Sequence, residues 1–141
     1  MSQPQILIVD DDASARRLLS YVLTDAGYRT QAVKNGYEAD RITRGQFFDL
    51  ALLDKKMLGL DGIETLKRIK RNNKETIVII MTAYGTIRSV VEAMKEGAYD
   101  YITKPFDMDE LVATVRDALC KKAAPAMPQF VSDEYWTVSV T

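Results

Sequence analysis

The sequence contains no histidine, one cysteine, four prolines and seven glycines in 141 residues. Without histidine the chain cannot form a Ser-His or Cys-His nucleophile pair or an imidazole metal site, and it cannot itself carry a phosphohistidine. The single cysteine, Cys120, excludes an internal disulfide and a CxxC site and fits a reducing cytoplasm. We expect its side chain to be buried or half-buried as a small hydrophobe. The remaining chemistry belongs to carboxylates, hydroxyls and lysines.

The sequence also lacks an excess of one charge and a long apolar run. Nineteen Lys and Arg residues balance twenty Asp and Glu residues, so the formal net charge is -1. This balance is unsuited to nonspecific nucleic-acid binding, and we expect no direct DNA binding by this chain. No apolar run approaches the roughly 20 residues of a membrane span, and the first residues do not resemble a signal peptide. We therefore expect a soluble, cytoplasmic protein without membrane contact.

Short apolar runs alternate with amphipathic stretches along the chain. The runs predict strands over 5–9, 29–33, 50–53, 77–81 and 99–103, and apolar residues at three- and four-residue spacing predict a helix after each strand. The polar second run predicts an edge strand. This (βα)5 order fits an α/β, doubly wound, flavodoxin-like parallel sheet with strand order 2-1-3-4-5. A ligand of such a sheet binds at the carboxyl ends of strands 1 and 3.

The last part of the sequence breaks this alternation. We predict one domain over residues 1–122, followed by a linker or tail over 123–141, which begins with Ala-Ala-Pro-Ala-Met-Pro. Residues 135–141 alternate apolar and polar side chains, as a strand would. The tail is therefore either a linker or disordered end, or a strand added to a sheet edge or to a partner molecule.

Reactive side chains follow four of the five predicted strands: Asp10, Asp11 and Asp12, then Asp54, Thr82 and Lys104. The predicted topology brings these strand ends to one rim. Carboxylates within a few ångströms of one another repel, so their cluster implies a divalent cation, and Mg²⁺ suits oxygen ligands and phosphate. Asp54 is the candidate nucleophile of a phosphoryl transfer. Mg²⁺ and Lys104 would offset the developing negative charge, and Thr82 would donate a hydrogen bond.

Five blocks of the sequence carry a family resemblance: Ile6-Leu-Ile-Val-Asp-Asp11, Leu52-Leu-Asp54, Leu60-Asp-Gly62, Met81-Thr-Ala83 and Ala98-Tyr-Asp-Tyr-Ile-Thr-Lys-Pro105. In this order and spacing, over residues 4–122, they resemble the receiver domain of bacterial two-component response regulators. The resemblance implies a phosphoacceptor whose phosphoryl donor is a sensor histidine kinase or phosphotransfer protein. It also implies a switch rather than an enzyme, since such a domain catalyses only its own phosphorylation and dephosphorylation.

The resemblance further implies a role for each residue of the site. Asp54 would be the phosphoacceptor and Lys104 would contact the phosphoryl group. The Mg²⁺ ligands would be the carboxylates of Asp10, Asp11 and Asp54 and the backbone carbonyl of Lys56.

Four other positions carry expectations from the same resemblance. Thr82 and Tyr101 would form a switch pair that remodels the surface of helix 4, strand 5 and helix 5. Lys56 and Tyr84 would tune the lifetime of the phosphoryl group. The peptide bond before Pro105 is expected to be cis.

Several alternatives stay open at this stage. Residues 98–111 are similar both to receivers of AAA+ transcription activators and to stand-alone phosphorelay proteins, and a homodimer through helix 4, strand 5 and helix 5 or through the tail is a further option. The pattern Asp10-x-Asp12-x-Ser14 superficially matches a haloacid dehalogenase-type phosphatase with Asp10 as nucleophile, although Asp54 would then have no role. A flavin or nucleotide module is disfavoured because no glycine-rich phosphate loop is present.

A basic group of residues on the third predicted helix has a simpler interpretation. We expect these side chains to form a solvated face rather than a nucleic-acid patch. They are Lys67, Arg68, Lys70 and Arg71.

Overall fold

The computed structural model describes residues 3–54, 60–83 and 87–123, over which strands and helices alternate. The strands are β1 (Gln5–Val9), β2 (Arg29–Val33), β3 (Leu50–Asp54), β4 (Ile77–Thr82) and β5 (Asp100–Thr103). The helices are α1 (Ala13–Asp25), α2 (Gly36–Gly45), α3 (Gly62–Asn72), α4 (Ile87–Lys95) and α5 (Met108–Ala123). Lys56, Tyr84 and residues 124–141, on which three of our predictions fall, lie outside the described residues.

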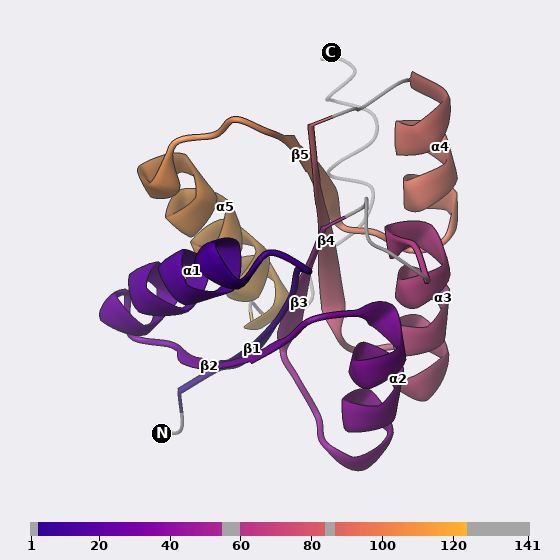
Figure 1. Ribbon diagram of the computed structural model, residues 1–141, viewed down its shortest axis with the longest axis horizontal. Coiled ribbons are helices and arrows are strands. Elements are labelled where there is room, and N and C mark those ends of the chain that lie inside the picture. Colours follow the sequence, from indigo (N-terminus) through magenta and orange to yellow (C-terminus); the bar gives the residue numbers. More distant parts are fainter. Residues whose placement is uncertain (1–2, 55–59, 84–86, 124–141) are drawn as a thin grey trace.

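The five strands form one parallel sheet in the order β2-β1-β3-β4-β5. Figure 1 shows the twisted sheet between two helical layers, with α1 and α5 on one side and α2, α3 and α4 on the other. The predicted flavodoxin-like topology and the edge position of the second strand are confirmed. The strand boundaries agree to within one residue, since β3 and β4 each extend one residue further and β5 begins one residue later.

The strands are buried because helices cover both faces of the sheet. Successive side chains of a strand point to opposite faces, so Ile6 and Ile8 pack toward α1 and α5 while Leu7 and Val9 pack toward α3. All four side chains are fully buried. This core holds the carboxyl ends of the strands at fixed positions along one edge of the sheet.

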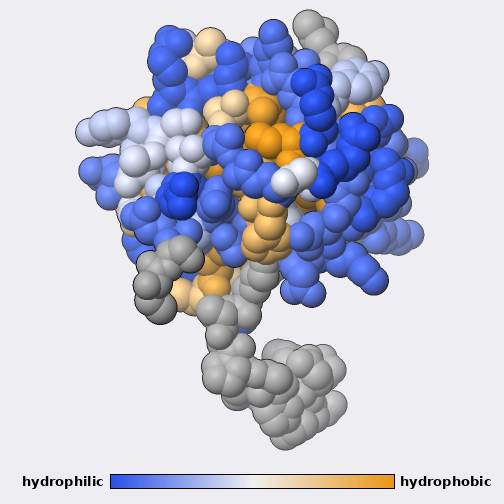
Figure 2. All heavy atoms as spheres, turned by 90° about the horizontal axis from the view of Figure 1, so that it is seen from below, coloured by the Kyte–Doolittle hydropathy of each residue, from blue (hydrophilic) through white to orange (hydrophobic). Residues whose placement is uncertain are grey.

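The helices turn their remaining faces to solvent. Along α5 the buried positions are Leu111, Val115 and Ala118, which share one face at helical spacing. Cys120 falls off that face and is exposed, so the expectation of a buried or half-buried cysteine is wrong. Seen from below, the surface in Figure 2 is mainly hydrophilic, with strongly hydrophobic residues near its centre and smaller hydrophobic areas toward its margin. Within the described ranges, no helix has the length and apolar character that a membrane crossing requires.

Candidate functional site

The register of the sheet brings the predicted acidic residues together. Val9 of β1 pairs with Leu53 of β3, so the residues that follow them, Asp10 and Asp54, emerge side by side at the carboxyl edge. Carboxylate oxygens of Asp10, Asp11 and Asp54 all lie within 4.8 Å of one another. Asp10 and Asp54 are buried, whereas Asp11 is exposed. Three hard oxygen ligands at this spacing form an acidic cluster that could bind a metal.

All polar atoms of Asp10 except one make hydrogen bonds to described residues. Its amide donates to the Val33 carbonyl at 3.2 Å, its Oδ1 accepts from the Asp12 amide at 3.0 Å, and its carbonyl accepts from Arg16 Nη1 at 2.7 Å. Oδ2 is buried and has no hydrogen-bond partner among the residues that the structure describes. A buried oxygen without a partner costs about 1–3 kcal/mol, so this atom marks a position where a ligand is favourable.

Asp12 sets the entry into α1 beside this cluster. Its side chain accepts a hydrogen bond from the Ser14 amide at 3.0 Å, which caps the first turn of the helix. The chain therefore leaves β1, passes Asp11 and enters α1 within a few residues. The first turn of α1 therefore fixes the C-terminal end of the acidic segment.

Lys104 places one positive charge between two of the carboxylates. Its Nζ lies 3.6 Å from Asp54 Oδ1 and 3.7 Å from Asp10 Oδ2. Both distances exceed an ordinary hydrogen bond, so the contacts are ion pairs. The Lys104 amide also donates to the Thr82 carbonyl at 2.7 Å, and the following bond to Pro105 is cis, as predicted.

Thr82 and Tyr101 lie on the neighbouring strands β4 and β5. Thr82 is buried at the end of β4, and Tyr101, which pairs with Ile80, is half-buried. The Tyr101 hydroxyl lies 3.1 Å from the hydroxyl of Ser89 on α4. Ser89 and Arg16 are contacts that our sequence analysis missed, because no spacing rule marks a serine or an arginine that reaches across from a neighbouring helix.

A cavity of about 480 Å³ opens next to the acidic cluster, between α1 and the start of α5. Asp10 and Lys104 line one part of it, and apolar side chains such as Leu18, Phe106 and Met108 line another. The buried edge of the site is therefore accessible from this side.

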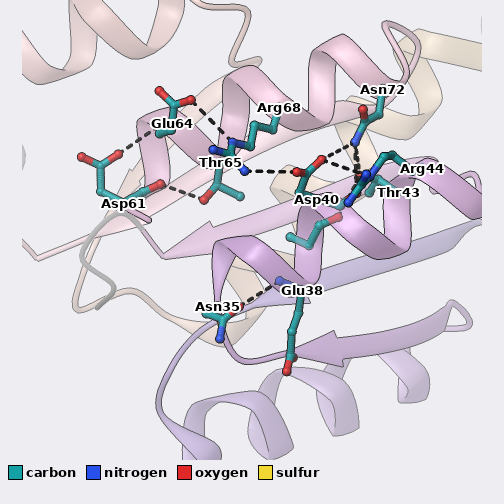
Figure 3. Close-up of polar contacts among 11 residues, drawn as sticks. Asn35, Glu38, Asp40, Thr43, Arg44, Asp61, Glu64, Thr65, Arg68 and Asn72 are labelled. Atoms are coloured by element: carbon teal, nitrogen blue, oxygen red, sulfur yellow. Dashed lines mark hydrogen bonds and ion pairs between the residues drawn. The ribbon is translucent and has the colours of Figure 1, made fainter. Parts of the chain in front are cut away.

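A second polar cluster lies between α2 and α3, away from the sheet edge, and is drawn in Figure 3. Asp40 accepts hydrogen bonds from Asn72 at 2.9 Å and from Arg68 at 3.1 Å, and Arg44 lies 3.7 Å away. The Asn72 hydrogen bond, together with the charges of Arg44 and Arg68, holds the pKa of Asp40 below its ordinary value despite the opposing effect of burial.

The second cluster corrects our expectation for the basic group on α3. Arg68 faces α2, with 28% of its side chain exposed, and binds the buried Asp40. Lys70 donates from Nζ to the carbonyls of Lys74 and Thr76, both at 2.8 Å. These two residues are structural contacts rather than parts of a purely solvated face.

Comparison with known proteins decides the family. Residues 6–116 match the family model of the response regulator receiver domain. The chain belongs to this family. Membership of this family makes it a signalling domain of the response-regulator type. This confirms the predicted family and the predicted class of function.

Similar proteins show where such receivers occur. Transcriptional regulatory protein ZraR of Klebsiella oxytoca is 47% identical over 117 residues, which are 83% of this chain and 26% of that protein. Sporulation initiation phosphotransferase F of Bacillus subtilis is 45% identical over 121 residues, which are 86% of this chain and 94% of that protein. This chain thus spans about a quarter of one relative and nearly all of the other.

Solved structures give the same result for the fold. A CheY-like response regulator receiver domain protein from Methanospirillum hungatei JF-1 aligns with a TM-score of 0.83 at 28% identity, covering 86% of this receiver and 97% of that chain. Nothing in these comparisons supports the haloacid dehalogenase-type phosphatase that the pattern around Asp10 left open.

Proposed function

We propose that Asp54 of this receiver domain accepts a phosphoryl group from a sensor histidine kinase or a phosphotransfer protein. The observation that carries the proposal is the position of Lys104, whose ammonium group lies 3.6 Å from Asp54 and 3.7 Å from Asp10. A fixed cation beside a carboxylate nucleophile is what phosphoryl transfer requires, since negative charge spreads over the peripheral phosphoryl oxygens. The 141 residues contain no histidine, so the donor imidazole comes from outside them.

Besides the donor and Mg²⁺, the transfer uses protein groups that lie at the sheet edge. A carboxylate oxygen of Asp54 attacks phosphorus, a P–O bond forms as the P–N bond to the donor imidazole breaks, and the electron pair of that bond returns to the imidazole. Lys104 contacts the peripheral oxygens and the Thr82 hydroxyl donates a hydrogen bond to one of them. The acyl phosphate is later hydrolysed, so the domain modifies only itself and acts as a switch rather than as an enzyme.

Mg²⁺ is the cofactor in this proposal. Asp10, Asp11 and Asp54 would hold the ion together with the backbone carbonyl of Lys56, which the family resemblance supplies. The fit is supported by the buried Asp10 Oδ2, which accepts no hydrogen bond from the described residues, and by a donor set made only of hard oxygens. Bound Mg²⁺ supplies positive charge that offsets the charge of the phosphoryl oxygens.

Thr82 and Tyr101 are the proposed switch residues. Thr82 lies at the end of β4 near the phosphoacceptor, and the Tyr101 ring on β5 contacts α4 through Ser89. A change at Thr82 that moves this ring would alter the surface of α4, β5 and α5, on which Ile87, Val91 and Met94 are exposed. We propose this surface as the route to an output or to a homodimer.

The remaining predictions rest on the family resemblance and on the sequence pattern. Lys56 and Tyr84 would set the lifetime of the acyl phosphate. Residues 1–122 would form the receiver and residues 123–141 a linker or an added strand that could also serve a dimer. A cytoplasmic location follows from the kinase partner and from the single cysteine.

Intact mass spectrometry after incubation with Mg²⁺ and acetyl phosphate tests the central step. We expect one phosphoryl adduct on the wild-type chain, and none on Asp54→Asn or after chelation of the metal. Asp117→Asn, at an exposed position on α5, is the matched control and should react like the wild type. An adduct that persists in Asp54→Asn but disappears in Asp10→Asn would overturn the proposal in favour of Asp10 as nucleophile.

A further inference from the structure

Arg16 touches the acidic edge but has no part in the chemistry proposed above. It lies on α1, is half-buried, and donates from Nη1 to the carbonyl oxygen of Asp10 at 2.7 Å. Its own amide donates to the Asp12 carbonyl at 3.0 Å, near the start of the helix. The side chain therefore reaches back along the helix to the end of β1 and closes a loop around the acidic segment.

This contact fixes a peptide group rather than a side chain. The Asp10 carbonyl belongs to the same planar unit as the Asp11 amide, so a bond that holds the carbonyl also holds the plane between these two residues. The Asp10 amide and Oδ1 are already bound, to Val33 and Asp12. Arg16 supplies the remaining constraint, and only Asp10 Oδ2 is left directed into the cluster without a hydrogen-bond partner in the described part of the chain.

We propose that Arg16 is a positioning residue for the metal site, and that it acts by orienting the Asp10–Asp11 peptide. The inference rests on the proposed function, because it assumes that these two carboxylates bind Mg²⁺. Groups that orient metal ligands change metal affinity by roughly 10- to 100-fold when they are removed. Positioning by Arg16 therefore strengthens Mg²⁺ binding.

The charge of Arg16 has the opposite effect on Mg²⁺ affinity. The direction in which the affinity changes when Arg16 is removed therefore tests the inference. A nearby positive charge repels Mg²⁺, and at a separation of one Debye length in water this repulsion amounts to about twofold in affinity. If Arg16 acted only through its charge, removing it would strengthen Mg²⁺ binding slightly. If it positions the peptide, removing it weakens binding.

The adjacent Arg17 provides the matched control. It carries the same charge on the same helix and is exposed. We would compare Arg16→Met with Arg17→Met, since methionine keeps an unbranched stem but has neither charge nor donor. Mg²⁺ titrations of the full chain would be followed by amide and carbonyl chemical shifts. We expect Arg16→Met to bind Mg²⁺ about tenfold more weakly than the wild type, and Arg17→Met to stay within about twofold.

A metal-free spectrum gives a second readout that does not depend on Mg²⁺. Loss of a charged donor reduces the polarisation of the Asp10 carbonyl, so the carbonyl ¹³C of Asp10 and the amide ¹⁵N of Asp11 should shift in Arg16→Met but not in Arg17→Met. Arg16→Lys, which keeps a donor and the charge, should recover part of the affinity. It also serves as the informative variant if Arg16→Met does not fold.

The outcomes separate this inference from the proposal on which it rests. Equal Mg²⁺ affinities for Arg16→Met and the wild type, or tighter binding by both methionine variants, would overturn the positioning role while leaving the metal site intact. A wild-type chain that shows no Mg²⁺-dependent shifts around Asp10 would overturn the metal site itself, and the positioning role with it.

Discussion

Buried carboxylates occur at two places in this receiver, and the two places differ in how many carboxylate oxygens accept hydrogen bonds. Asp40 between α2 and α3 receives hydrogen bonds from Arg68 and Asn72, and its pKa lies below the ordinary value. At the sheet edge, Asp10 and Asp54 share one lysine at more than hydrogen-bond distance, and Asp10 Oδ2 has no hydrogen-bond partner in the described ranges. We call Asp40 and its partners the complete group, because both oxygens of this carboxylate accept hydrogen bonds, and the sheet-edge cluster the incomplete group, because Asp10 Oδ2 accepts none from the described residues.

The surroundings of the Asp40 group show why it is structural. A Cβ added at Gly36, the first residue of α2, would collide with Thr65 Oγ1 of α3, so the two helices meet without spare room. Arg68 joins Asp40 on one side and Glu64 on the other, as Figure 3 shows. Both oxygens of the Asp40 carboxylate accept hydrogen bonds there, and such a satisfied carboxylate inside a tight interface fixes how the two helices pack. At the sheet edge, by contrast, Asp10 Oδ2 accepts no hydrogen bond from the described residues, which favours the binding of a ligand.

The largest effect on stability is expected from breaking the complete group. Asp40→Ala leaves Arg68 and Asn72 facing an apolar side chain in the helix interface. Removing one member of a fully buried pair costs about 3–5 kcal/mol, and because Arg68 is partly exposed we expect a loss of about 2–3 kcal/mol in the free energy of unfolding. Urea denaturation at neutral pH measures this loss.

The control for that experiment is Asp117→Ala on α5, where an exposed aspartate is removed from a helix. Its free energy of unfolding should change by no more than about 0.5 kcal/mol. Similar losses in Asp40→Ala and Asp117→Ala would mean that the network between α2 and α3 adds nothing specific, and the contrast between the two groups would fail.

The incomplete group should respond in the opposite direction. In the absence of Mg²⁺, Asp10→Asn removes one of three mutually repelling carboxylates, and we expect a gain of about 1 kcal/mol in the free energy of unfolding. Added Mg²⁺ at ten times its dissociation constant should stabilise the wild type by about 1.4 kcal/mol, and Asp10→Asn by much less. Thermal or urea unfolding with and without Mg²⁺ compares the two chains. Destabilisation of metal-free Asp10→Asn would show that Lys104 already compensates the cluster.

The two groups also differ in whether the sequence could predict them. Asp10, Asp54 and Lys104 each follow a strand, and parallel strands bring their carboxyl ends to one edge, so the site follows from the order of the elements. Asp40 and Arg68 lie on different helices, 28 positions apart, and no periodicity says that their side chains meet. A run of basic residues therefore predicted a solvated face where the structure has an interior contact.

The same reasoning applies to single residues beside the site. Arg16 and Arg17 are adjacent residues of the same type, so the sequence does not distinguish them. The orientation of α1 relative to β1 decides which of them reaches the Asp10 carbonyl. The contact of Ser89 with Tyr101 depends in the same way on how α4 lies against β5. Sequence order predicted the strand ends, whereas contacts between a helix and its neighbours required the packed structure.

The smallest expected effect concerns the pH dependence of the Asp40 group. Because its pKa is lower in the folded chain than the ordinary value of 3.8, the folded state binds this proton less readily than the unfolded state. Its contribution to stability is therefore fully present above about pH 5 and decreases as the pH falls through 3.8 toward the lowered folded pKa. In Asp40→Asn this contribution is absent at every pH, although the amide oxygen can still accept a hydrogen bond.

Urea unfolding of the wild type and Asp40→Asn between pH 7 and pH 3 measures this difference. The gap between the two free energies of unfolding should be constant down to about pH 5 and should narrow below that. All measurements are made without Mg²⁺, so that binding at the sheet edge does not contribute. A gap that widens toward acid would mean that the folded chain binds the Asp40 proton more tightly than the unfolded chain. The hydrogen bond from Asn72 and the charges of Arg44 and Arg68 would then fail to outweigh the cost of burying that carboxylate.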